Sequence, residues 1–405
     1  MDIEIRPIAF EERPDWIRAA DIAFSAATKD DEIEATLPTI EIDRSFAAVD
    51  GGRIVGTSAS ITTRMVVPGG ARIPTAGVTM VGVQPTHRRR GINTRMMTAL
   101  LDQATERGEP IAALFASEGA IYGRFGYGLA AFYGEFQAES ARMGFVRGYA
   151  PSGRVELVSK DDAMPTVSRI YDSALRAGGV ERNDVLRDYA FSEVGHDMKD
   201  KPWFYAVHRA EDGEADAYAV YTMKHAWPRS VPTGTIEVRE SMATTPQGYA
   251  DIWRYLFDID LVATVEAWNR PLDDPLLVLV AEPRRLRFGV GDGLWVRLLD
   301  IPAALSARRY ASDGRLVFEV SDPFRPETDG RHELVVEDGT GACARTEAKA
   351  DLAGTVNVLG ATYLGGTSFA QIAAAGQLEE RTDGSVALAD ALFRWTPAPW
   401  SAWDF

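Results

Sequence analysis

The spacing of hydrophobic positions changes at one place in the chain, and the rest can be arranged around it. Val78 to Val83 is an apolar run rich in β-branched residues and closed by Pro85, which predicts an interior strand. Apolar residues then return at the spacing of one helical face, at Ile92, Met96, Met97, Leu100 and Leu101. Gly108 can end that helix. The pattern therefore predicts a strand, a short turn and a helix in direct succession.

The turn carries concentrated positive charge. Arg88, Arg89 and Arg90 are followed at once by Gly91, so these residues stand at the predicted start of the helix. The first N–H groups of a helix have no partner within it and carry the positive end of its dipole, so they attract an anion. Glycine permits close approach of the backbone, and arginine adds charge-assisted bonds to phosphate oxygens. The stretch predicts a pyrophosphate-binding site.

The segments on either side of this site alternate between strands and helices. Before it we expect a strand at Ile3 to Arg6, a helix and a hairpin of Phe46 to Val49 with Ile54 to Val66. The buried face of that helix is predicted at Trp16, Ile17, Ala20, Ala23 and Phe24. After it, Ile111 to Ala116 is a further strand, followed by a glycine-rich segment that ends at Gly128.

The same plan restarts after about residue 150. Strands are predicted at Trp203 to His208, Ala217 to Met223 and Thr235 to Met242, and Thr245 with Pro246 predicts the start of a helix. No arginine cluster stands before this second helix, so we expect a degenerate copy without the phosphate site. Beyond it, strands from Leu316 and from His332 predict an antiparallel ribbon, and an apolar helix is expected near Ile372.

Composition and charge narrow the possible partners. The 405 residues are 46% hydrophobic and carry a formal net charge of −16, which is unfavourable for binding nucleic acid or an anionic membrane and suits a cationic substrate. The charged run of Lys29, Asp30, Asp31, Glu32 and Glu34 is interpreted as a solvated loop or helix face or, alternatively, as a surface that recruits such a substrate. No apolar run approaches the length of a membrane span, and with one cysteine and no signal segment we expect a cytoplasmic protein. The five histidines lack ligand spacing, so no metal site is expected.

Two motifs resemble a known family. Val81, Val83, Arg88 and Gly91 match the V-x-V and R-x-x-G acetyl-CoA signature of the GNAT N-acyltransferases. The longer strings VQPTHRRRGIN and ASEGAIYGRFGYG resemble the enhanced intracellular survival (Eis) acetyltransferases over the whole chain. Asn93 departs from the glycine or alanine at the last place of the general motif, but it still offers its backbone N–H.

The resemblance implies a mixed α/β (α+β) fold of three domains. They are a catalytic GNAT domain at 1–150, a degenerate GNAT-like domain at 151–293 and a sterol carrier protein-like domain at 294–405, whose C-terminus reaches the active site. The residues that it implies for binding acetyl-CoA are Val81, Gly82, Val83, Arg88, Arg89, Arg90, Gly91, Ile92, Asn93, Thr94, Ser117 and Glu118.

The resemblance also assigns catalytic roles. Tyr122 would be the general acid for the departing CoA thiolate, and Tyr127 competes with it on chemical grounds. The terminal carboxylate of Phe405 would take a proton from the attacking amine, and Asp404 would bind the cationic acceptor. The alternative interpretations are that Tyr122 is simply a half-buried aromatic residue and that the aromatic chain end is packed for stability alone.

We therefore expect an acetyl-CoA-dependent N-acetyltransferase that acts by direct transfer. The family resemblance points to aminoglycosides acetylated at several amines, or to lysine side chains, and to a hexamer. The alternatives are a lipid-binding or protein-interaction module regulated by acetyl-CoA, and a structural scaffold with a relict CoA site.

Overall fold

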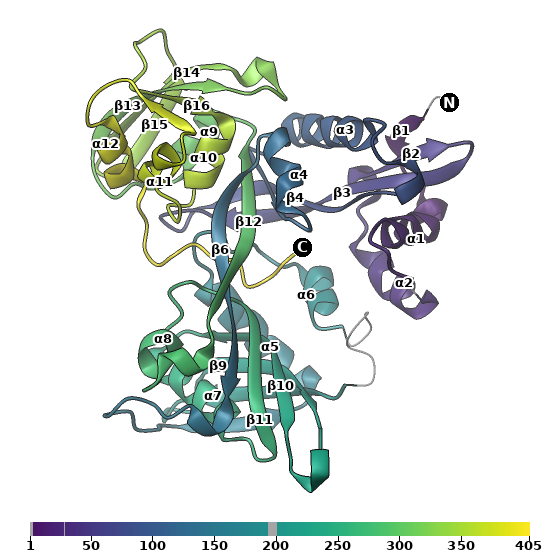
Figure 1. Cartoon of the computed structure of the whole chain (residues 1–405), viewed down its shortest axis with the longest axis vertical. Helices are drawn as coiled ribbons and strands as arrows, with labels where there is room; N and C mark the ends of the chain where they lie inside the picture. The colour runs from purple at the N-terminus through teal and green to yellow at the C-terminus, as the bar shows by residue number, and fades with distance from the viewer. Residues whose placement is uncertain (1–2, 28, 193–200) are drawn as a thin grey trace. The chain divides into compact units, whose positions relative to one another are not determined.

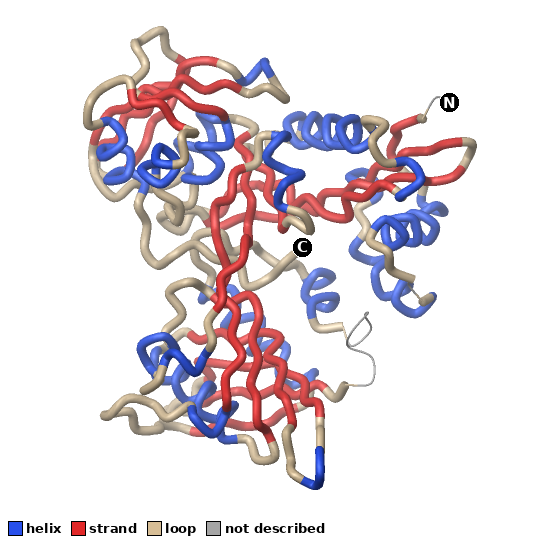
Figure 2. The backbone as a smooth tube through the Cα atoms, in the orientation of Figure 1, coloured by secondary structure: helices blue, strands red, loops and turns tan. Residues whose placement is uncertain are grey.

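The computed structural model describes residues 3–27, 29–192 and 201–405 (Figures 1 and 2). The chain forms two compact units. One comprises Met1–Ala131, Arg176–Asp197 and Asp292–Phe405, and the other comprises Phe132–Leu175 and Met198–Gly291. The division falls inside two long strands, β6 (Gly128–Glu139) and β12 (Gly289–Leu298).

The sheet of the first unit contains the predicted hairpin and central strand. Its order is β1 (Glu4–Pro7), β2 (Ser45–Asp50), β3 (Arg53–Val66), β4 (Arg72–Val83), β5 (Ile111–Phe115) and β12. The hairpin of β2 and β3 is confirmed. The central strand β4 begins earlier than its apolar run, because it continues the meander from β3. Leu294–Leu298 lies within the range predicted for the third domain, but it pairs antiparallel with β5 of the first.

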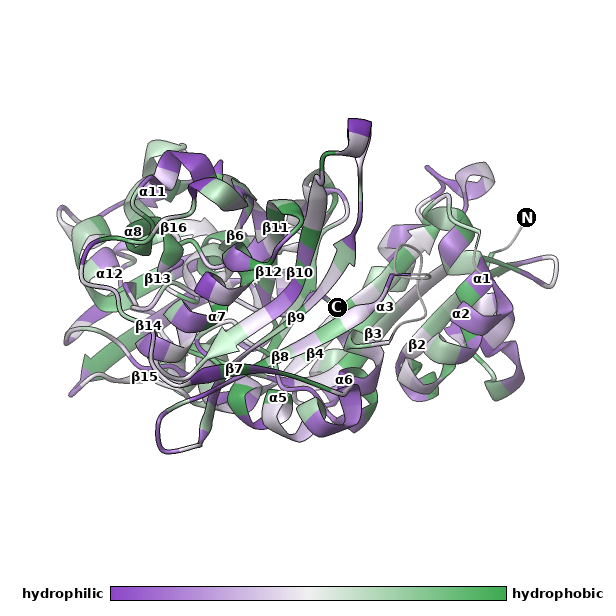
Figure 3. Ribbon diagram, turned by 90° about the horizontal axis from the view of Figure 1, so that it is seen from below, coloured by the Kyte–Doolittle hydropathy of each residue, from purple (hydrophilic) through white to green (hydrophobic). Residues whose placement is uncertain are grey.

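Four helices of this unit are α1 (Arg13–Ala23), α2 (Asp30–Thr36), α3 (Ile92–Glu106) and α6 (Asp184–Ala190). In Figure 3 both α1 and α2 carry hydrophobic and hydrophilic residues, as helices that bury one face do. The predicted face of α3 is confirmed, since its five apolar residues are all buried. Phe24 departs from the predicted helix face, since it lies just past the end of α1 and is half exposed. The acidic run is exposed at Lys29, Asp30, Asp31 and Glu34, as expected, but Glu32 is buried and its carboxylate caps the Lys29 N–H.

β4 contains a bulge near its C-terminal end, where it parts from β5 but stays paired with β3. β4 pairs with β5 in parallel only as far as Gly77 and Ala113. The register with β3 shifts between the pair Ala59–Thr79 and the pair Thr57–Gly82, and Met80 within this bulge has φ 51°. The Thr57 hydroxyl donates to the Met80 carbonyl at 2.8 Å, which satisfies a group that the bulge removes from the ladder. Beyond Gly77, the backbone of β4 is therefore unpaired on the side of β5.

The second unit repeats the plan, as predicted. Its strands follow the order β6, β11 (Val262–Arg270), β10 (Gly234–Ala243), β9 (Ala215–Lys224), β8 (Trp203–Arg209) and β7 (Arg154–Val158). Its helices are α5 (Lys160–Ala174), α7 (Pro246–Asp258) and α8 (Leu276–Leu279). β10 and β11 are parallel and joined by α7, as β4 and β5 are joined by α3.

The start of α7 is occupied by a side chain of the protein itself. Thr245 caps α7, as predicted, by accepting from the Gly248 N–H at 3.0 Å. The Thr245 hydroxyl itself donates to the Asp216 carboxylate, which lies so close that a Cβ on Gly248 would be 2.6 Å from its Oδ1. The negative group at this helix start is thus a side chain of the protein, in the place where the first copy is open.

The C-terminal part forms a separate sheet in the first unit. Its strands follow the order β15 (Thr340–Arg345), β14 (Gly330–Glu337), β13 (Gly314–Ser321), β16 (Leu352–Thr355) and β17 (Leu378–Glu380). Its helices are α9 (Ile301–Ala307), α10 (Val356–Thr362), α11 (Phe369–Ala374) and α12 (Ser385–Phe393). The antiparallel ribbon of β13 and β14 and the helix at Ile372 are confirmed. Among the helices that the structure describes, none is both long and apolar enough to cross a membrane.

Candidate active site

The end of β4, the arginine turn and the start of α3 border one pocket of about 570 Å³. Ser117 and Glu118, which follow β5, and Ile121 and Arg124 of the glycine-rich segment complete its wall. Of the residues predicted to bind acetyl-CoA, the pocket brings together Val81, Gly82, Val83, Arg88, Arg89, Gly91, Ile92, Asn93, Thr94, Ser117 and Glu118. Arg90 is outside this lining, and its guanidinium donates to the Thr86 carbonyl at 3.2 Å.

The start of α3 is open to an anion. Gly91 is the N-cap with φ 74°, a left-handed conformation that suits glycine, and no side chain caps the helix. The first N–H groups of α3 are therefore directed at the pocket without a side-chain acceptor. Arg89 has φ 62°, which is uncommon for a residue with a side chain and recurs at ligand sites. Asn93 Oδ1 is buried in the pocket wall without a hydrogen-bond partner in the described part of the chain.

Arg88 and Arg89 differ in what their side chains already contact. The Arg88 guanidinium donates to the Ala23 carbonyl at 2.9 Å and to the Val83 carbonyl at 3.2 Å. It therefore ties the C-terminal end of α1 to the end of β4, a position where a cation also complements the helix dipole. Arg89 is exposed at the pocket. The two arginines are consequently unequal candidates for phosphate binding.

Six lining residues were not predicted from the sequence: Ala23, Phe24, Ser25, His87, Ile121 and Arg124. The first three come from the end of α1, which the fold brings beside β4. His87 pairs with Asp50, with 3.1 Å between Nε2 and Oδ2. Arg124 is part of the IYGRFGYG string, and its charge inside that motif was the one available signal.

Tyr122 and Tyr127 lie together next to this pocket. Their rings are edge-to-face with centroids 6.0 Å apart, and both belong to the core cluster that includes Met97, Leu100 and Leu101 of α3. Burial, with a smaller contribution from the Glu118 charge, raises the pKa of Tyr122 to about 12. Tyr122 therefore stays protonated at neutral pH and is able to donate a proton.

Tyr127 is less suited to exchange a proton with a substrate. It is fully buried, and its hydroxyl has no hydrogen-bond partner in the described residues. Burial raises its pKa above that of Tyr122, although the Arg297 charge lowers it in part. Tyr122 is 5% exposed and its neighbour Ile121 lines the pocket, so the geometry favours Tyr122 of the two.

The chain end is docked, as its aromatic composition predicts. The Trp400 N–H donates to the Ala177 carbonyl at 2.8 Å, and Arg182 lies 5.4 Å from the centre of the Trp403 ring. The segment that receives them is itself paired to β3 through the bridge between Met65 and Val180. Trp400 and Trp403 are 8% and 5% exposed, which confirms that this end is packed.

Phe405 reaches the place where β4 and β5 part. A Cβ on Gly77 would lie 3.2 Å from Cε2 of Phe405, and the Phe405 ring contacts the rings of Phe115 and Trp403, each with centroids 5.7 Å apart. Asp404 is half-buried beside it. The chain end thus lies at the last paired residues of β4 and β5. Among the described residues, no group of three or more His, Cys, Asp or Glu side chains could hold a metal ion.

Comparison with protein-family models accounts for most of the chain. Residues 4–130 and 178–298 each match an acetyltransferase (GNAT) domain, and residues 301–402 match a sterol carrier protein domain. These matches show the predicted fold of two GNAT domains followed by a sterol carrier protein-like domain.

Whole-chain relatives agree with the domain matches. An uncharacterized N-acetyltransferase of Streptomyces avermitilis is 39% identical over 92% of each chain. The N-acetyltransferase Eis of Mycobacterium bovis is 33% identical over 85% of this chain and 84% of its own. The crystal structure of Eis1 from Mycobacterium abscessus superposes with a TM-score of 0.87 at 31% identity, and the match covers all of both chains.

Proposed function

The chain belongs to the Eis family of GNAT N-acetyltransferases, and from that premise we propose that it transfers acetyl groups from acetyl-CoA directly to the amines of polycationic acceptors. The observation that carries the proposal is the pocket in which the uncapped start of α3, Arg89 and the free edge of β4 meet beside Tyr122. GNAT enzymes use acetyl-CoA as the acetyl donor, and this pocket offers the donors that a pyrophosphate requires.

The binding roles follow from the groups that face the pocket. The N–H groups at the start of α3 and the guanidinium of Arg89 would hold the pyrophosphate. Backbone N–H groups of β4 beyond its bulge, around Val81 to Val83, would hold the acetyl oxygen, because β4 has no strand partner there on the side of β5.

Tyr122 and Phe405 would carry the protons. The terminal carboxylate of Phe405 takes a proton from the attacking amine, whose nitrogen forms the new bond to the acetyl carbon as the carbon–sulfur bond breaks. Tyr122 gives its phenolic proton to the departing sulfur, and the proton on the Phe405 carboxyl then restores the tyrosine through solvent. The products are an acetamide and CoA thiol, and no acyl-enzyme is formed.

The acceptor class rests on charge. A net charge of −16 and the Glu118 carboxylate in the pocket wall favour cationic molecules, and Asp404 offers a second anion at the chain end. A site with several carboxylates binds a polyamine in more than one orientation. We therefore expect aminoglycosides acetylated at more than one amine, or lysine side chains, as acceptors. By the same family relationship we expect a hexamer, which light scattering of the purified protein measures.

The interior of the sterol carrier protein-like domain bears on the lipid-binding alternative. Phe369 and Phe393 pack with ring centroids 4.9 Å apart, and Phe318 stacks on Phe369 at 5.9 Å. The buried Arg308 guanidinium lies 4.6 Å from the centre of the Phe393 ring and donates to the Phe393 carbonyl at 2.8 Å. Aromatic side chains of the domain itself thus pack at its core, and the pocket of about 740 Å³ on this domain is lined mainly by charged and polar residues. Both features support a role in the acetyltransferase rather than in carrying lipid.

The test is release of CoA thiol from acetyl-CoA with a panel of polyamines, aminoglycosides and lysine peptides, followed by mass spectrometry of the exhausted reactions. We expect release with cationic acceptors and products that carry more than one acetyl group. A single acetyl at one position would contradict the multi-amine acceptor. Release with no member of the panel would favour the binding-module alternative.

A further inference from the structure

The segment that carries Tyr122 has little structure of its own. It consists of the four-residue helix α4 (Gly119–Tyr122) and a 3-10 turn at Gly123–Phe125 before β6 begins. Two backbone bonds close it, from the Tyr127 N–H to the Tyr122 carbonyl at 3.3 Å and from the Gly126 N–H to the Gly123 carbonyl at 3.1 Å. Such a short turn cannot fix the direction of a side chain without support from elsewhere.

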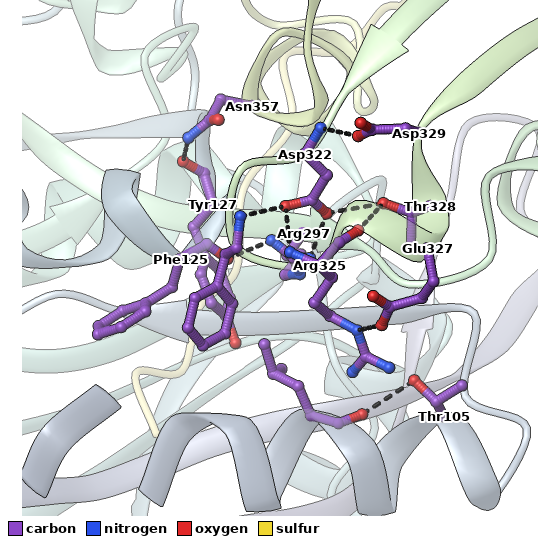
Figure 4. Close-up of polar contacts among 12 residues, drawn as sticks. Thr105, Phe125, Tyr127, Arg297, Asp322, Arg325, Glu327, Thr328, Asp329 and Asn357 are labelled. Atoms are coloured by element: carbon purple, nitrogen blue, oxygen red, sulfur yellow. Dashed lines mark hydrogen bonds and ion pairs between the residues drawn. The ribbon is translucent and has the colours of Figure 1, made fainter. Parts of the chain in front are cut away.

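Asn357 supplies that support from the sterol carrier protein-like domain. Its side-chain amide nitrogen donates to the Gly123 carbonyl at 2.6 Å and to the Tyr127 carbonyl at 2.8 Å, the second of which is drawn in Figure 4. One amide group therefore uses both of its N–H donors on the two sides of the turn that follows Tyr122. The segment is fixed by a residue 234 positions further along the chain.

Arg297 and the motif glycines complete the contact. Arg297 donates to the Phe125 carbonyl and pairs with Asp322, and both side chains are fully buried (Figure 4). Gly126 has φ 83°, and a Cβ there would collide with the Arg297 guanidinium. A Cβ on Gly128 would lie 2.1 Å from the Asn357 carbonyl oxygen. Gly126 and Gly128 are therefore required by the approach of Arg297 and α10.

From these contacts we propose that Asn357 is a positioning residue for Tyr122, so that the sterol carrier protein-like domain fixes the general acid as well as the chain end. The proposal rests on the proposed function, since it assigns Asn357 a role through Tyr122. Asn357 lies outside the lining of the pocket, so its effect is expected on turnover rather than on the binding of acetyl-CoA.

The test measures kcat and the Kd for acetyl-CoA in the full-length protein for wild type, Asn357→Ala, Tyr122→Phe and the double variant. We expect Asn357→Ala to lower kcat roughly tenfold or more with Kd unchanged, and to lower it no further in the Tyr122→Phe background. The kcat of Asn357→Ser, whose hydroxyl can keep one of the two hydrogen bonds, should lie between those of the wild type and Asn357→Ala. The serine variant replaces the alanine variant in every comparison if the alanine variant does not fold.

The control is Ser368→Ala in the same domain. This variant loses the cap of α11, where Ser368 Oγ accepts from the Gln371 N–H at 3.1 Å, and leaves the Tyr122 segment untouched. The unfolding temperature and the kcat of Ser368→Ala together show how far a loss of stability alone affects turnover. An unchanged kcat in Asn357→Ala, or an equal loss in the presence and absence of the Tyr122 hydroxyl, overturns the positioning role. Full kcat in Tyr122→Phe overturns the general acid and with it this proposal, and absence of transfer in the wild type overturns both proposals.

Discussion

The ring of Phe405 stands edge-on to the ring of Phe115, with centroids 5.7 Å apart and the ring planes at 85°. Phe115 is the last residue of β5, so this contact fixes the chain end at the point where β4 and β5 part. A residue from the far end of the sequence is thereby brought to the proposed acetyl-transfer site of the first GNAT domain.

The chain end gives the first prediction. Amidation of the Phe405 carboxylate is expected to lower kcat/KM strongly while the unfolding temperature stays the same, because it removes the charge and leaves the ring contacts intact. A free α-carboxyl has a pKa of about 3.3 to 3.7, and apolar surroundings raise it toward the value a base requires. Extension by a few residues should have the same effect. Full kcat/KM in the amidated protein would exclude the carboxylate as the base.

The alkaline side of the pH–rate profile gives a second prediction. The pKa of Tyr122 is raised to about 12, mainly by burial, so the protonated acid persists well above pH 10. Turnover should therefore not fall with a midpoint near the ordinary tyrosine value of about 10. The midpoint is obtained from steady-state kcat measured between pH 8 and 11, with circular dichroism at each pH to confirm folding. A midpoint near 10 that Tyr122→Phe abolishes would contradict the buried environment.

The arginine turn gives a third prediction. Arg89→Ala should raise the KM for acetyl-CoA roughly 10- to 100-fold with little change in stability, since a charge-assisted phosphate bond contributes about 1.5 to 3 kcal/mol. Arg88→Ala should also lower the unfolding temperature, because it removes the bonds to the Ala23 and Val83 carbonyls. Arg107→Ala, at the opposite end of α3, is the matched control. Unchanged KM in the Arg88 and Arg89 double variant would refute the phosphate assignment.

The second unit gives a prediction about stability. His208 is buried, with Nδ1 2.6 Å from Asp216 and Nε2 2.7 Å from the Ser152 carbonyl and 3.2 Å from Asp251. Burial lowers its pKa, but the hydrogen bonds to Asp216 and to the Ser152 carbonyl and the charges of Asp216 and Asp251 outweigh it, so the pKa is raised above 6.5.

A raised histidine pKa contributes stability that is complete below about pH 6.5 and is lost as pH rises through the folded-state value. Urea midpoints of the wild type should therefore fall as the pH rises from 6 to 9. His208→Gln should be less stable at pH 6 and should lose this part of the pH dependence. An identical pH dependence in the two proteins would show that folding leaves the pKa of His208 unchanged, and would contradict the raised value.

The parts of the site that the sequence predicts are those made from neighbouring residues. The run from Val78 to Leu101 contains a strand, a turn rich in arginine and glycine and a helix face, and all three are local patterns. The end of α1 in the pocket wall could not be predicted this way, because it reaches β4 only through the packing of α1 on the sheet.

Long-range contacts account for the remaining differences. The pairing of Leu294–Leu298 with β5 joins strands far apart in the sequence, and no local pattern specifies it. Nothing in the sequence around Asn357, near the start of an apolar helix, indicates a role for it. Its role is inferred from its hydrogen bonds to the Gly123 and Tyr127 carbonyls, which only the fold brings close. The IYGRFGYG string marked Tyr122 through family resemblance, whereas the need for glycine at Gly126 and Gly128 follows from their contacts with Arg297 and α10.

The central claim is that Tyr122 donates a proton to the departing CoA sulfur and makes no contribution to the binding of acetyl-CoA. It is tested most directly by measuring the acetyl-CoA Kd and kcat on one preparation of Tyr122→Phe, with Tyr127→Phe as the control. The account predicts an unchanged Kd with kcat lowered roughly 100-fold or more in Tyr122→Phe, and near wild-type turnover in Tyr127→Phe. Wild-type kcat in Tyr122→Phe, or the large loss in Tyr127→Phe instead, would contradict it.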